Sequence, residues 1–61
     1  MEELLFEKDQ ILNFKTGERA VVRSINVGGA LFKDPIIWVR FKDVPGKEVA
    51  YSQSKLIRLV V

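Results

Sequence analysis

The side chains of this chain that could act on a ligand are one aromatic ring and several cations, and they gather around residues 35–42. Trp38 is the only tryptophan, and Arg40 and Lys42 follow it at intervals of two residues. Side chains at that spacing share one face of a strand. A flat ring beside cations can stack on a planar group and donate charge-assisted hydrogen bonds to an anion. With two cations from the preceding segment, the candidate binding residues are Arg19, Arg23, Trp38, Arg40 and Lys42.

The sequence contains neither cysteine nor histidine, and this excludes several kinds of site. Disulfides are impossible, and so are zinc, iron–sulfur and haem sites that need thiolate or imidazole ligands. Nucleophilic triads built on Cys or His are excluded too. No close pair of carboxylates lies in the apolar context that acid–base catalysis needs. Because 61 residues also enclose little of a pocket, we expect a protein without catalytic activity, cofactor or metal.

A central strand must position the candidate residues. Residues 35–41 are rich in β-branched and aromatic side chains, and a turn signal with proline and glycine follows them. A turn at Val44–Gly46 returns the chain antiparallel, with apolar residues meeting on one face and an ion pair on the other. Trp38 and Arg40 then point outward. The expected pairs are Phe41 with Val49, Val39 with Tyr51, Lys42 with Glu48, Arg40 with Ala50 and Trp38 with Ser52.

The segment before the central strand predicts further extended structure. Residues 4–6 and 11–14 are apolar patches whose spacing also allows a helix, but the turn signal at 15–17 favours short extended segments. Residues 18–25 alternate as a strand, and burying its two arginines without paired acids would be costly. Its expected inward residues are Ala20, Val22 and, as a third candidate, Ser24, and its outward residues are Arg19, Val21 and Arg23.

The longest connection runs from residue 26 to residue 34. A tight turn at its two adjacent glycines would pair residues 24–27 with residues 30–33, and the alternative is an irregular loop. Leu31 and Phe32 are unusually apolar for a loop. They either cap the open end of a small core or form, with Ile36, an apolar patch for a partner.

The rest of the chain predicts one turn of helix at residues 52–54 and a last strand at residues 55–61. The whole therefore predicts a single domain, residues 1–61, in which an acidic segment, residues 1–9, precedes a barrel, residues 10–61. We expect a small, five-stranded, antiparallel, all-β SH3-like barrel with a one-turn 3₁₀ helix before its last strand.

Charge is distributed unevenly along the chain, whose net charge is +2. In residues 1–9 four acids stand against Lys8, a net charge of −3, so the remaining residues carry +5. A basic body with an acidic leader suits an acidic partner, and the leader could cover the basic face when no ligand is bound. The start of the chain has no long apolar run, so we expect no signal peptide or membrane span and a cytoplasmic protein.

The pattern of core and turn residues in 14–59 extends across most of the expected barrel. Its members are Phe14-x-x-Gly17-x-x-Ala20-x-Val22, then Trp38-Val39-x-Phe41-x-Asp43, then Gly46, Ser52, Leu56 and Leu59. This pattern resembles the one shared by Tudor-like and KOW-like domains. The Tudor-like resemblance implies an aromatic cage for a methylated cation, with Trp38, Tyr51 and Phe32 as its candidates. The KOW-like resemblance implies binding to RNA or to ribosomal or transcription components, which suits the basic surface better.

A second resemblance covers a shorter stretch. Residues 35–44, with the sequence Pro-Ile-Ile-Trp-Val-Arg-Phe-Lys-Asp-Val, are similar to a Pro-x-x-Val-Arg-Phe-x-x-Val stretch in the small stromal accessory subunit of photosystem I. The chain has one residue more before Val-Arg-Phe and lacks that family's basic opening. This resemblance implies docking on a larger complex.

Two functions therefore remain open. In the first, the cations contact the phosphates of RNA or single-stranded DNA while Trp38 stacks on an unpaired base. In the second, the same face docks on a protein, or a second copy of this chain completes an apolar patch around Val21 and Ile36. The alternative to both is that Trp38 only packs on its own outer face and the arginines are solvated. We expect a monomer or a small homo-oligomer.

Overall fold

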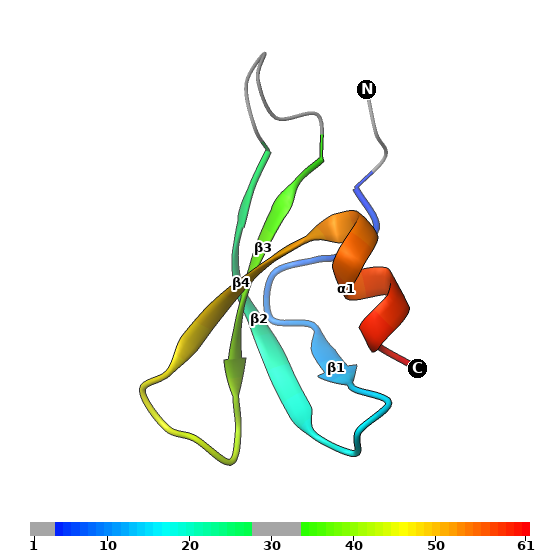
Figure 1. The fold of residues 1–61 in the computed structure, drawn as a ribbon. Coiled ribbons are helices and arrows are strands. Elements are labelled where there is room, and N and C mark those ends of the chain that lie inside the picture. Colours follow the sequence, from blue (N-terminus) through cyan, green and yellow to red (C-terminus); the bar gives the residue numbers. More distant parts are fainter. Residues whose placement is uncertain (1–3, 28–33) are drawn as a thin grey trace.

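The computed structural model describes residues 4–27 and 34–61, and within them the chain forms one antiparallel sheet and one helix. The sheet order is β1-β2-β3-β4, so each strand lies beside its neighbour in sequence (Figure 1). The expected small, mainly β fold is confirmed. The elements are β1 (Ile11–Asn13), β2 (Arg19–Asn26), β3 (Ile36–Phe41), β4 (Glu48–Ser52) and α1 (Gln53–Leu59).

The predicted fifth strand is wrong, and with it the closed five-stranded barrel. Residues expected to form one helical turn and then a strand instead form the two-turn helix α1, after which Val60 makes a single bridge to Phe14. The apolar residues of this segment also fit a helical spacing, because Leu56, Leu59 and Val60 are three and four positions apart. Across the described residues the sheet stays open, and α1 covers its core side (Figure 1).

The start of α1 is held by the chain entering β3. The Gln53 N–H donates to the Pro35 carbonyl at 2.8 Å. The Asp34 carboxylate accepts from the Ser54 N–H at 3.2 Å and from the Ser54 hydroxyl at 2.6 Å. Ser52, at the N-cap position, makes no side-chain capping bond, and the first turn has no acid of its own. Asp34 therefore caps the helix from a distant part of the sequence.

Replacing Asp34 by alanine should lower the free energy of unfolding by about 1 kcal/mol, the usual cost of a lost N-cap. Asp34→Asn should cost less, because the amide oxygen still accepts the Ser54 N–H. Asp43→Ala is the matched control, since Asp43 is exposed in the β3–β4 connection. Urea unfolding followed by circular dichroism would measure all three. Equal midpoints for Asp34→Ala and Asp43→Ala would show that the cap does not stabilise the helix.

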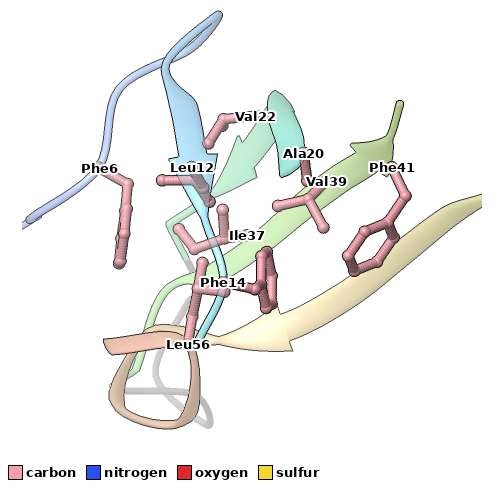
Figure 2. Packing of buried hydrophobic residues seen from close by; sticks show 9 residues of the cluster. All are labelled: Phe6, Leu12, Phe14, Ala20, Val22, Ile37, Val39, Phe41 and Leu56. Carbon is pink, nitrogen blue, oxygen red and sulfur yellow. The ribbon is translucent and has the colours of Figure 1, made fainter. Parts of the chain in front are cut away.

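The core lies between the sheet and α1, and Figure 2 shows its side chains converging from the strands, the helix and the N-terminal segment. The Phe14 ring lies 5.0 Å from the ring of Phe41 and 5.9 Å from that of Tyr51, between centroids. Tilted ring pairs at such distances are favourable. The buried residues are Phe6, Leu12, Phe14, Ala20, Val22, Ile37, Val39, Phe41 and Leu56.

The acidic N-terminal segment takes part in this core. Phe6 is buried within it, and the Leu5 N–H donates to the Gln53 side-chain oxygen at 2.8 Å, at the start of α1. The Asp9 N–H donates to the Val22 carbonyl at 2.8 Å, which continues the chain into β1. Leu5 and Phe6 are thus held on the core side of the sheet, so the idea that the leader covers the opposite, basic face is wrong for these two residues.

The predicted turn between β3 and β4 is present, but the predicted register is displaced by two residues. Lys47 N–H donates to the Val44 carbonyl at 3.3 Å, and Gly46 has φ +84° after a proline, which is a type II turn. A further turn precedes it, so residues 42–47 all lie outside the strands. A shift of two preserves which face each side chain occupies. The observed pairs are Ile36 with Ser52, Ile37 with Tyr51, Trp38 with Ala50, Val39 with Val49 and Arg40 with Glu48.

Strand β2 has the predicted length, begins and ends one residue later than predicted, and contains a bulge. Val22 pairs with Val39 and Ser24 pairs with Trp38, so Arg23 is an extra residue on β2. The bulge reverses the alternation, which turns Ser24 outward and brings Ile25 against the core. The prediction that Ser24 faces inward is therefore wrong. Ala20 and Val22 are buried as expected.

Candidate binding face

The candidate residues come together on the side of β2 and β3 that faces away from the core, which we call the outer face. Cross-strand pairing arranges it in rows across the sheet. One row joins Arg19 to Lys42, whose N–H donates to the Arg19 carbonyl at 3.0 Å. The other rows are Ile11-Val21-Arg40-Glu48, Ser24-Trp38-Ala50 and Asn26-Ile36-Ser52.

Trp38 lies at the centre of this face with 40% of its surface exposed. Its cross-strand neighbours are small, Ser24 on β2 and Ala50 on β4. The predicted neighbour on β4 was Ser52, and the two-residue register shift replaces it by Ala50. Because the directly paired residues on both sides are small, they leave the ring accessible. The outward orientation of Trp38 is therefore confirmed.

A bulge in β2 lies beside this ring. Arg23 and Ser24 are both exposed, and both lie opposite the one residue Trp38. A strict alternation would have sent one of the two inward. The sequence contains a signal for the bulge, because Ile25 is a better core residue than Ser24. Its consequence is that Ser24 joins Arg23, which alternation alone already turns outward, on the same side of the sheet as the exposed indole.

The remaining cations differ in their surroundings. Arg19 and Lys42 are exposed at one end of the outer face. Arg40 is half-buried between Val21 and Glu48, and its Nε has no hydrogen-bond partner. Glu48 was predicted to lie opposite Lys42. Because of the two-residue register shift, Glu48 lies opposite Arg40 and supplies its opposite charge across the sheet.

Tyr51 lies on the core side of the sheet, with its ring near that of Phe14, whereas Trp38 is on the outer face. These two candidates for an aromatic cage are therefore on opposite sides of the sheet. The third, Phe32, lies outside the described residues, and so does Leu31 of the apolar patch. The remaining residue of that patch, Ile36, is half-buried on the outer face between Asn26 and Ser52.

The pairing of residues 24–27 with residues 30–33 is not observed where it can be judged. Ser24, Ile25 and Asn26 pair with residues 36–38 of β3. Residues 24–26 therefore extend the pairing of β2 with β3. The predicted turn at residues 28 and 29 lies outside the described residues.

Two further observations concern the kinds of site the chain could hold. Among residues 4–27 and 34–61, no group of three or more acidic side chains is arranged to hold a metal ion. In the same residues, the helix is neither long nor apolar enough to cross a membrane.

No protein-family model, curated protein sequence or solved structure matches this chain.

Proposed function

We propose that this chain is a non-catalytic binding module that holds RNA or single-stranded DNA on its outer face. The observation that carries the proposal is the row in which Arg23 and Ser24 lie opposite an indole that is 40% exposed. An exposed ring accepts a stacked base, and a cation next to it can reach the phosphate of the same nucleotide. The resemblance to Tudor-like and KOW-like SH3-like barrels agrees with such a role and remains a prediction.

The spacing of the cations on the outer face suits a single-stranded nucleic acid segment of a few nucleotides. Arg19 and Arg23 are four positions apart on β2, about 13 Å at the usual rise of a strand, which allows for separate phosphates. Lys42 lies beside Arg19, and Arg40 lies between the two ends. Cations along both strands with a ring in the middle form a charged path for a backbone with one platform for a base.

Protein docking is the second candidate, because apolar residues share the outer face. Ile11 is more than half exposed and is paired with the half-buried Val21. Arginine and tryptophan are also enriched in the central residues of protein interfaces. Binding that depends on apolar contacts should respond weakly to salt, whereas phosphate contacts release counterions and respond strongly.

The salt dependence of oligonucleotide binding therefore tests the proposal. Mixed-sequence single strands should quench Trp38 fluorescence, and the logarithm of the association constant should fall linearly with the logarithm of salt concentration. About 0.7 counterions are released per phosphate contact, so the four cations predict a slope no steeper than roughly −3. Duplex DNA, whose bases are not free to stack, should quench less. No quenching at low salt would overturn the nucleic-acid proposal and leave a protein partner.

A further inference from the structure

The two edges of the sheet differ in whether another segment of the chain bonds to them. The β1 edge is covered by the end of the chain, because the Lys15 N–H donates to the Leu59 carbonyl and the Val61 N–H donates to the Asn13 carbonyl, both at 2.8 Å. At the other edge of the sheet, no strand in the described part of the chain pairs with the edge of β4 that faces away from β3. An open strand edge offers its main-chain groups to another strand.

The direction of the main chain identifies which residue of β4 faces this edge. The Lys42 N–H donates to the Arg19 carbonyl, so the main-chain groups of Lys42 point from β3 toward β2. Because these directions alternate along a strand, Val39 points toward β4, where its partner is Val49. The next residue, Ala50, therefore turns its N–H and carbonyl away from β3 and toward the open edge.

Strand β4 has few of the features that usually prevent edge-to-edge pairing, since Glu48 is its only charged residue. Its sequence, Glu48-Val49-Ala50-Tyr51-Ser52, has no proline, no lysine and no charge that points toward the core. Natural edge strands rely on such residues, or on a bulge, to avoid another strand. Ala50 is exposed and small, so no side chain hinders an approaching strand there.

The sequence of β4 is also complementary to itself. When two copies are placed antiparallel about Ala50, Glu48 of each copy lies opposite Ser52 of the other, so no like charges meet. Val49 of each copy lies opposite Tyr51 of the other on the core side, where both are half-buried in one copy. Apolar cross-strand pairs of this kind stabilise a sheet. We propose that two copies of this chain associate through their β4 edges with this register and form one continuous sheet.

The pairing would extend the outer face. Trp38 pairs with Ala50 within each copy, so the row Ser24-Trp38-Ala50 would continue into Ala50 and Trp38 of the second copy. At the usual spacing of neighbouring strands the two indoles would be three spacings apart, about 14 Å. The second copy would thus supply another aromatic platform and another set of cations. This consequence rests on the proposed function, whereas the pairing of the sheets does not.

A single cysteine at position 50 tests the register, since the chain has no cysteine of its own. In Ala50→Cys the two α-carbons would be about 5.5 Å apart, the separation of a hydrogen-bonded antiparallel pair. A short bismaleimide should therefore convert this variant to a covalent dimer much faster than Thr16→Cys, whose residue is also exposed, in the β1–β2 turn. Equal rates for the two variants would overturn the proposed register.

The mass of the protein in solution, without nucleic acid, tests the association itself. Sedimentation of the unmodified chain should show a dimer that dissociates on dilution. Ala50→Pro should be monomeric, because proline removes the N–H that faces the edge, while Ala50→Thr keeps that N–H and should remain dimeric. Circular dichroism would verify that both variants are folded. A monomer for the unmodified chain at every concentration would overturn the proposal.

The two proposals fail in distinguishable ways. A dimer that does not bind oligonucleotides would overturn the proposed function and leave the β4 pairing intact. A monomer that binds single strands would do the reverse. If both hold, Ala50→Pro should bind with lower affinity than Ala50→Thr, because two linked faces hold one strand more tightly than one face does.

Discussion

Leu56→Ala should lower the free energy of unfolding by about 2–5 kcal/mol, the usual cost of removing a large buried aliphatic side chain. Leu56 is completely buried and comes from α1, the element that covers the core side of the open sheet. Figure 2 shows it reaching from the helix toward the interior, where Phe14 and Ile37 lie. A domain of this size has only a few kcal/mol to lose, so a large share of this variant should be unfolded at 37 °C.

Ile57→Ala is the matched control, because it removes a similar side chain from the next position of the same helix. Ile57 is 45% exposed, and alanine has the higher helix propensity, so the two effects should nearly cancel. Urea denaturation of both variants, followed by far-ultraviolet circular dichroism, gives the two differences in free energy. If Ile57→Ala were the more damaging of the two, residues 53–59 would not pack as α1 does.

Trp38→Ala should weaken binding to single-stranded oligonucleotides by about 5-fold to 150-fold, the equivalent of a lost base–aromatic stack of about 1–3 kcal/mol. The fold should remain, because Trp38 lies on the outer face and is not one of the buried core residues. Fluorescence anisotropy of a labelled oligonucleotide provides the measurement, since this variant no longer contains tryptophan.

Two pairs of variants separate stacking from charge. Trp38→Phe keeps a ring and should retain most of the affinity, whereas Trp38→Leu keeps the apolar character only and should behave like Trp38→Ala. Arg23→Ala should weaken binding to all sequences alike and reduce the salt slope by about 0.7. Arg58→Ala, on α1, should change neither quantity. An unchanged affinity for folded Trp38→Ala would contradict the stacking role.

Several features of the fold follow from short-range rules. Pro45 and Gly46 occupy the two central positions of the turn predicted between β3 and β4, which the structure shows to be of type II. Gly17 has φ +97° in the predicted turn before β2. The faces of Trp38 and Val39 follow from alternation alone, because a strand with one buried face permits only one assignment. The outward cations on β2 follow from the cost of burying an unpaired charge.

The register between β3 and β4 could not be predicted from these short-range rules alone. Displacing the pairing by two residues leaves every side chain on the same face, and both registers oppose a cation to Glu48. Only the length of the connection, in which two turns follow each other, distinguishes them. The neighbour of Trp38 is therefore Ala50 instead of Ser52, which affects both the access to the ring and the proposed β4 pairing.

Residue types and strand alternation were enough to predict the composition of the site, the side of the sheet on which most of it lies and the kinds of chemistry that are excluded. Packing across the whole chain was needed to show that residues 53–59 form a helix, that β2 bulges at Arg23 and that Phe6 of the acidic segment packs into the core. The physical reason is the same in each case. The apolar spacing of these segments satisfies two local conformations, and the choice between them depends on which one covers the open side of the sheet with Leu56, Ile25 and Phe6.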